Sequence, residues 1–212
     1  MPQSLRVLVA EDDGAHSRHL DREIRELGHL VVGLAADGSS ALSMARALDP
    51  DVVVLGVHLP GLDGAAAAQR IHEERPVAIV LSGEHIGPDL AERIAALPVF
   101  GVLPPGASAA HLRIALAVAH ARHQEWRREQ IRADELTQRL EDRKVIERAK
   151  GILMQREGLS ESDAYRMLQR TSQSRNVPMA ELSRSLLAAE ELIAPPSRPP
   201  VRRPPSSPPP AR

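Results

Sequence analysis

The chain has 212 residues, 42% hydrophobic and 26% charged, which is typical of a globular protein with one medium and one smaller domain. It contains neither a membrane-length apolar run nor a secretory signal pattern, so we expect a cytoplasmic protein with no membrane partner. The absence of cysteine excludes disulfides, thiolate metal sites and cysteine nucleophiles, and a single Phe, Tyr and Trp are too few for a platform that stacks single strands.

The net charge of −1 conceals an uneven distribution of charge along the chain. Residues 1–111 carry 8 basic and 15 acidic side chains, whereas residues 143–187 carry 9 basic and 5 acidic ones. An acidic N-terminal part joined to a basic C-terminal part favours a regulatory domain connected to a polyanion-binding one. Chance asymmetry between two solvated surfaces is the alternative.

Apolar runs of strand length alternate with amphipathic segments of helix length through residue 121. The Val/Leu/Ile runs are continuous, which is typical of strands covered on both faces. The alternation predicts an α/β fold over residues 1–121, with a doubly wound, five-stranded parallel sheet. The expected strands are 5–10, 30–36, 51–57, 77–82 and 99–103, and the expected helices are 16–28, 39–49, 63–75, 89–97 and 108–121.

The rest of the chain is helical up to a proline-rich end. A seam at heptad spacing predicts a long helix over 112–142, which either forms a coiled coil or connects two domains as an exposed helix. Three amphipathic segments, 143–158, 160–176 and 178–193, predict a three-helix bundle over 136–193. Residues 194–212 are expected to be a disordered tail. The seam comprises Leu112, Leu116, Ala119, His123, Trp126, Gln130, Ala133, Thr137 and Leu140.

Three features of the bundle are predicted from single residues. Ser160 precedes Asp163 by three residues, which indicates a capped helix start, and Gly158 is a helix stop. Gly151 lies inside a helix, where glycine is unfavourable, so we expect another helix or RNA to approach it closely. Tyr165 is expected in the core with its hydroxyl at the edge, and a base-stacking role is the alternative.

Polar residues follow the strands at the edge where parallel sheets place their chemistry. Glu11, Asp12 and Asp13 come directly after the first strand, and clustered carboxylates are typical of a hard-cation site or a helix cap. The third strand ends at Gly56 and the fourth at Ser82, and Pro104 follows the fifth.

In order and spacing, the motifs "VLVAEDD", "DVVVLGVHLPGLDG" and "AIVLSGE" make this region resemble a response-regulator receiver domain, a flavodoxin-like fold. The resemblance implies that an acidic pair binds Mg²⁺, that an aspartate ending the third strand accepts a phosphoryl group, that a Ser or Thr ends the fourth strand, and that a lysine precedes a proline after the fifth. Glu11, Asp12 and Ser82 fit this pattern. Gly56 stands at the phosphoacceptor position and Pro104 at that of the lysine.

We therefore interpret the domain as a pseudo-receiver. A covalent aspartyl phosphate needs a carboxylate nucleophile, which Gly56 lacks. Asp51 lies roughly 16 Å away along the strand, and Asp63 is expected to form a turn or helix cap. No cofactor is required, and at most a weak Mg²⁺ site remains at Glu11 and Asp12.

The stretch "VIERAKGILMQREGLSESDAYRMLQRTSQSRNVPMAEL" resembles the ANTAR module of transcription antiterminators, which implies binding to paired hairpins in nascent RNA. Cations that meet phosphates suit this role, with an ordinary solvated face as the alternative. The candidate RNA-binding residues are Lys144, Arg148, Lys150, Arg156, Arg166, Arg170 and Arg175, and Arg143 extends the same field.

The sequence thus predicts an RNA-binding antitermination regulator that works independently of aspartyl phosphorylation. We expect a homodimer, with a protein partner on the receiver face as one source of the signal. The alternatives are a phosphorelay regulator phosphorylated at Asp63 or another non-standard residue, a DNA-binding transcription factor, and a pure interaction scaffold. No nucleophile and base pair, glycine-rich phosphate loop or histidine metal pattern indicates an enzyme.

Overall fold

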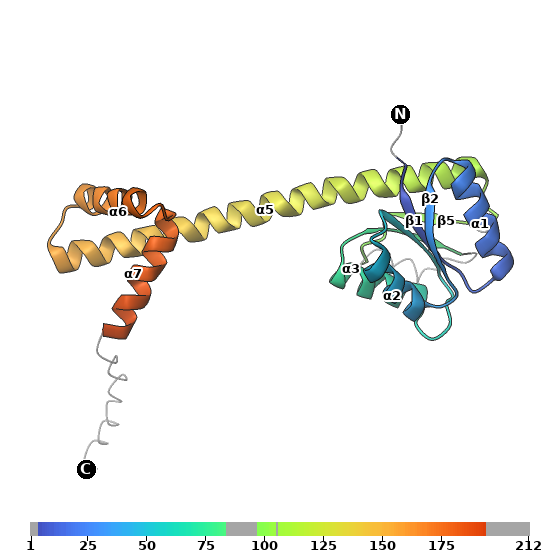
Figure 1. Cartoon of the computed structure of the whole chain (residues 1–212), viewed down its shortest axis with the longest axis horizontal. Helices are drawn as coiled ribbons and strands as arrows, with labels where there is room; N and C mark the ends of the chain where they lie inside the picture. Colours follow the sequence, from blue (N-terminus) through green and yellow to red (C-terminus); the bar gives the residue numbers. More distant parts are fainter. Residues whose placement is uncertain (1–3, 84–96, 105, 194–212) are drawn as a thin grey trace, which may run out of the picture. The chain divides into compact units, whose positions relative to one another are not determined.

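A computed structural model describes residues 4–83, 97–104 and 106–193 (Figure 1). The chain divides into two compact units, residues 1–131 and residues 132–212. The helix predicted at 89–97 falls almost wholly outside the described residues, and the tail predicted at 194–212 lies outside them. None of the described helices is long and apolar enough to span a lipid bilayer.

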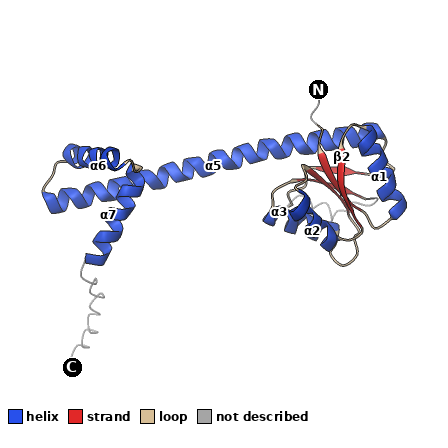
Figure 2. Ribbon diagram, in the orientation of Figure 1, coloured by secondary structure: helices blue, strands red, loops and turns tan. Residues whose placement is uncertain are grey.

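The first unit contains the predicted five-stranded parallel sheet (Figure 2). All neighbouring strands pair in parallel, in the order β2-β1-β3-β4-β5. This order agrees with the doubly wound topology expected from the alternating pattern. The strands are β1 (Arg6–Ala10), β2 (Leu30–Ala35), β3 (Val52–Gly56), β4 (Ala78–Ser82) and β5 (Gly101–Leu103).

Among the described residues, two helices cover each face of the sheet (Figure 1). In β1, Val7 and Val9 contribute to one core cluster, whereas Leu8 and Ala10 contribute to the other. The alternation explains why the strand reads as an unbroken apolar run, because both of its faces are buried. Helices α1 (Gly14–Glu26) and α5 (Ala109–Glu157) cover the first face, and α2 (Gly38–Leu48) and α3 (Gly64–Glu74) cover the second.

Helix α5 is a single helix of 49 residues, Ala109–Glu157, that begins in the first unit and ends in the second. It joins three predicted segments, 108–121, 112–142 and 143–158. The first three residues of the predicted seam, Leu112, Leu116 and Ala119, are buried in the core that lies against the sheet. These positions are therefore not available to a second chain, because they pack within their own domain.

A group of rings marks the place where α5 leaves the sheet. The imidazole of His123 stacks on the indole of Trp126 at a centroid distance of 6.0 Å, and its edge meets Phe100 at 5.4 Å. His72 from α3 contacts the other side of the cluster, 4.9 Å from Trp126. From residue 127 to residue 141 every side chain of α5 is exposed.

The second unit packs the end of α5 against α6 (Glu161–Arg175) and α7 (Met179–Ile193). Its core is small, with Ala149 and Leu153 of α5 buried against Ala164 and Leu168 of α6. Ion pairs tie α7 to α5, with Arg156 Nη1 at 3.1 Å from Glu190 Oε2 and Arg184 Nη2 at 2.5 Å from Asp142 Oδ1.

The predicted ends of these helices are confirmed. Ser160 caps α6 by accepting a hydrogen bond from the backbone N–H of Asp163. Gly158, which follows α5, has a φ of 64°, a left-handed conformation that favours glycine after a helix.

Candidate functional site

The pocket at the carboxyl edge of the sheet brings together three of the predicted residues. Gly56 and Ser82 are register partners at the ends of β3 and β4, and Glu11 follows the last residue of β1. A Cβ atom added to Gly56 would lie 2.7 Å from Oε2 of Glu11, which is too close for an unaltered structure. Glu11 therefore extends into the space that a side chain at position 56 would use.

Glu11 is almost wholly buried there, with 8% of its surface exposed. Its buried Oε1 accepts no hydrogen bond from the described residues, and Nε2 of His16 lies 3.6 Å from this Oε1 and 3.3 Å from the Ser82 hydroxyl oxygen. Burial raises the pKa of Glu11 to about 7 against the lowering effect of the Ser82 hydrogen bond, and Asp12 and Asp13 raise it further. At neutral pH the pocket thus holds a carboxyl group that is close to half protonated.

The Mg²⁺ site expected at Glu11 and Asp12 stays a prediction. Mg²⁺ takes one or two carboxylates together with water, and the burial that raises the pKa of Glu11 disfavours its charged form. Asp13 is engaged as the N-cap of α1, where it accepts a hydrogen bond from the N–H of Ala15 at 2.8 Å. Within the part of the chain that the structure describes, no group of three or more His, Asp or Glu side chains is placed to hold a metal ion.

The other carboxylates near β3 have structural roles. Asp63 caps α3 by accepting a hydrogen bond from the N–H of Ala66 at 2.7 Å, as the sequence predicts. Asp51 accepts a hydrogen bond from the N–H of Arg6 at 2.8 Å, at the opposite end of the strand from Gly56. Pro104 follows β5 and is exposed. Because proline carries no charge, it cannot replace the expected lysine in the strand-end pocket.

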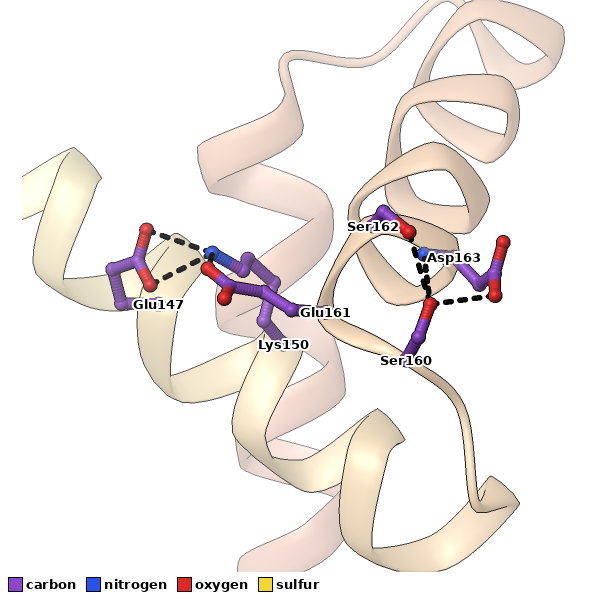
Figure 3. Close-up of polar contacts among 6 residues, drawn as sticks. All are labelled: Glu147, Lys150, Ser160, Glu161, Ser162 and Asp163. Carbon is purple, nitrogen blue, oxygen red and sulfur yellow. Dashed lines mark hydrogen bonds and ion pairs between the residues drawn. The ribbon is translucent and has the colours of Figure 1, made fainter.

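Lys150 does not have the exposure expected of an RNA-binding residue, and its contact with RNA stays a prediction. Only 6% of its surface is exposed, and its ammonium group is enclosed by two carboxylates. Nζ donates to Glu147 at 2.9 and 3.1 Å and to Glu161 Oε1 at 2.8 Å (Figure 3). These carboxylates, Glu161 before Glu147, raise the pKa of Lys150. With its three N–H donors engaged, Lys150 fixes the start of α6 against α5 instead of facing solvent.

The remaining predicted cations are exposed on the surface of the second unit. Several share their charge with a neighbouring acid: Lys144 pairs with Glu141 at 2.6 Å, and Arg166 approaches Asp163 at 3.4 Å. Exposed ion pairs of this kind are weak, so these side chains can exchange a carboxylate for a phosphate at little cost. The exposed set is Lys144, Arg148, Arg156, Arg166, Arg170 and Arg175, together with Arg143.

Tyr165 and Gly151 also differ from expectation. The side chain predicted to be in the core, Tyr165, is 44% exposed, because α6 turns Ala164 and Leu168 inward instead. A Cβ on Gly151 would meet no heavy atom within 4 Å. The expected close approach of another helix is therefore wrong for the described residues, and approach by RNA stays a prediction.

Two contributors to these sites were not singled out from the sequence. His16 lies in the first turn of α1 and contacts both Glu11 and Ser82. Glu147 accepts two hydrogen bonds from the ammonium group of Lys150. Its spacing of three residues before Lys150 was the available signal, since residues three apart share a helix face.

Comparison with known proteins agrees with both units. The family described as response regulator receiver domain matches residues 7–117, and the family described as ANTAR domain matches residues 134–187. The transcriptional regulatory protein PdtaR of Mycobacterium tuberculosis is 34% identical over 182 residues, which are 86% of this chain and 89% of that protein. The chain therefore belongs to the response regulators that carry a receiver domain followed by an ANTAR domain.

Two further similarities cover a smaller part of the chain. A two-component response regulator of the LuxR family from Aurantimonas sp. SI85-9A1 has a TM-score of 0.53 at 26% identity, covering 56% of this chain and 86% of that one. A protein-glutamate methylesterase/protein-glutamine glutaminase of Anaeromyxobacter dehalogenans is 44% identical over only 36% of this chain and 23% of that enzyme. The similarity to this enzyme thus covers only a part of each chain, whereas the family that spans the chain is regulatory.

Proposed function

We propose that this protein is an RNA-binding antitermination regulator of the cytoplasm, which binds paired hairpins in nascent RNA without being switched by aspartyl phosphorylation. The observation that carries the proposal is the exposed basic surface of a bundle that matches the ANTAR domain over residues 134–187. The likeness to a transcriptional regulatory protein over 89% of its length supports the same assignment.

Electrostatics suit the exposed cations to a phosphate backbone. Arg148 and Arg170 extend from α5 and α6 into solvent, where their charge attracts RNA and releases counter-ions from it. Each phosphate contact of this kind makes the affinity fall more steeply as the salt concentration rises. Sequence preference then requires contacts to unpaired bases, because a duplex RNA groove hides its base edges.

Independence from phosphorylation is supported by the strand-end pocket. Gly56 supplies no nucleophile, and the carboxylate of Glu11 fills the space beside it. Pro104 stands at the position expected for a lysine, so a phosphoryl group would also lack a compensating cation.

The proposal also includes a homodimer and a protein partner that binds the receiver unit and supplies the signal. Leu136 and Leu140, on the exposed stretch of α5, are 59% and 62% exposed and would be covered by pairing with a second copy of the helix. On the receiver unit, Val102, Ile114 and Val118 are exposed around one apolar hollow, which suits a protein partner. Light scattering of the full chain, with Leu136→Glu/Leu140→Glu as the variant, tests the dimer.

The assignment is tested by titrating the full chain with a paired-hairpin RNA, a scrambled RNA and a DNA duplex of equal length at matched salt. We expect tighter binding to the paired hairpins than to either control. Equal binding to all three would reduce the bundle to a non-specific polyanion binder. Preference for the duplex would favour a DNA-binding regulator.

A further inference from the structure

A hollow of about 540 Å³ opens on the surface of the second unit, where α6 begins beside α5. It is lined by Lys150, Ser160, Glu161, Ser162 and Tyr165. Figure 3 shows four of these side chains in the ion-pair and capping contacts that hold the start of α6. The hollow therefore has a fixed floor, because Lys150 is buried and joined to both helices.

One wall of the hollow is the ring of Tyr165, which does not pack in the core of the second unit. Tyr165 is the one aromatic residue within residues 132–212 and is 44% exposed, while the core beneath it is completed by Ala164 and Leu168. An exposed ring at the edge of a hollow offers a flat apolar face, and unstacked RNA bases bind on such faces.

The polar atoms around the ring are suited to the edge of a base. Glu161 gives its Oε1 to Lys150, yet its side chain remains 71% exposed, so the carboxylate can accept further hydrogen bonds. The hydroxyl groups of Ser160 and Ser162 lie 2.9 Å apart on the same rim. A carboxylate accepts hydrogen bonds from exocyclic amino groups, which adenine, guanine and cytosine carry and uracil lacks.

Charge distinguishes a base from a phosphate as the occupant. One ammonium group, that of Lys150, faces two carboxylates, Glu147 and Glu161, so the floor carries a net negative charge. A phosphate would be repelled there, whereas a neutral base with amino groups would be attracted. Arg166 lies beside this rim, where its Nε donates to the carbonyl of Ser162 at 3.4 Å, and its positive charge suits a phosphate.

We propose that this hollow receives one unpaired, amino-bearing base of the hairpin loop, stacked on Tyr165 with its amino group donating to Glu161. The inference rests on the proposed RNA-binding function and adds the subsite that reads the loop. It predicts that one loop position tolerates adenine, guanine or cytosine better than uracil.

The experiment uses the full chain and a paired-hairpin RNA in which 2-aminopurine replaces one loop base at a time. We expect the fluorescence of one position to be quenched on binding, and the quenching to be lost in Tyr165→Leu. Loss of one stacked base should weaken binding about 5- to 100-fold. The matched control Tyr165→Phe keeps the ring and should bind within about twofold of the parent chain.

The outcomes separate the two proposals. If the parent chain prefers hairpins to scrambled RNA but Tyr165→Leu binds as tightly as Tyr165→Phe, the subsite is wrong and the RNA function stands. If hairpin binding by the parent chain quenches no loop position, the subsite is also wrong, whatever the variants do to folding. If the parent chain has no preference for hairpins, both proposals are overturned.

Discussion

Oε2 of Glu11 lies 2.7 Å from the point where a Cβ on Gly56 would be. The two residues thus share one space, which the carboxylate of Glu11 fills from just beyond β1 because residue 56 has no side chain to occupy it. Ser82 and His16 complete the surroundings of the carboxylate. The pocket is filled from within, and its chemistry differs from that of a phosphoacceptor site.

Restoring an aspartate alone should not restore phosphorylation. In Gly56→Asp the new side chain must displace Glu11, and the site still lacks a lysine at Pro104. We expect no uptake of phosphate from acetyl phosphate and Mg²⁺ by the single variant, and uptake by Gly56→Asp/Pro104→Lys, measured by intact-protein mass spectrometry. Uptake by the single variant equal to that of the double variant would show that Pro104 is no obstacle.

Acid should destabilise the first unit through His123. Burial lowers the pKa of this imidazole to about 4, and Arg127, His72 and His120 lower it further. Between this value and the ordinary value near 6.5, the unfolded chain binds a proton that the folded chain does not, so stability falls as the pH falls. His123 alone should contribute a loss on the order of 2 kcal/mol between about pH 7 and about pH 5, which is measured in Glu11→Gln by urea unfolding followed through Trp126 fluorescence.

Glu11 should act in the opposite direction over a similar range. Its pKa is raised to about 7, so between 4.5 and 7 the folded chain binds the extra proton and gains stability as the pH falls. The two groups therefore offset each other in the parent chain. Glu11→Gln removes the offset from Glu11 and leaves the His123 effect, so the acid destabilisation should be steeper than in the parent chain. Identical pH profiles for variant and parent would contradict the assigned pKa shifts.

Lys150 should matter for folding more than for phosphate contact. Replacing it with Met leaves Glu147 and Glu161 without their shared cation, so we expect the melting temperature of the second unit to fall by several degrees. The matched variant Lys144→Met removes an exposed lysine with one partner and should melt as the parent does. Calorimetry of the full chain provides the comparison.

The salt dependence of RNA binding separates the two roles further. Arg148→Gln should reduce the slope of log affinity against log salt by about 0.7, as expected for one lost phosphate contact. Lys150→Met should leave that slope unchanged, even where affinity falls. A reduced slope in Lys150→Met would return this residue to the RNA interface.

Gly151 offers a test in which stability and function should move apart. Alanine in a helix interior is favoured over glycine by about 1 kcal/mol, and no atom of the described chain opposes a Cβ here. Gly151→Ala should therefore be more stable than the parent. If RNA approaches this surface, the same variant binds hairpins more weakly; unchanged affinity would place Gly151 outside the interface.

The sheet could be predicted because each strand is buried on both faces and therefore reads as a continuous apolar run. Val52 to Leu55 illustrate this, with alternate residues in the two core clusters. The strand-end cluster followed from the same topology, since parallel strands place Glu11, Gly56 and Ser82 at one edge. The helix caps at Asp63 and Ser160 could also be predicted from the sequence, because they depend only on local spacing.

The errors concern contacts between elements. A heptad seam does not reveal whether Leu116 packs on a second chain or on its own sheet. Lysine carries both a long apolar stem and a charge, so only the packing of α6 on α5 decides that Lys150 is buried. The inward turn of Glu11 depends on an empty volume beside Gly56, which no residue pattern encodes.

The most direct test of a receiver that phosphate does not switch is the affinity of the full chain for paired-hairpin RNA, measured with and without prior incubation in acetyl phosphate and Mg²⁺. We predict specific binding with the same dissociation constant in both conditions. Specific binding that appears only after treatment with the phosphodonor would contradict the account.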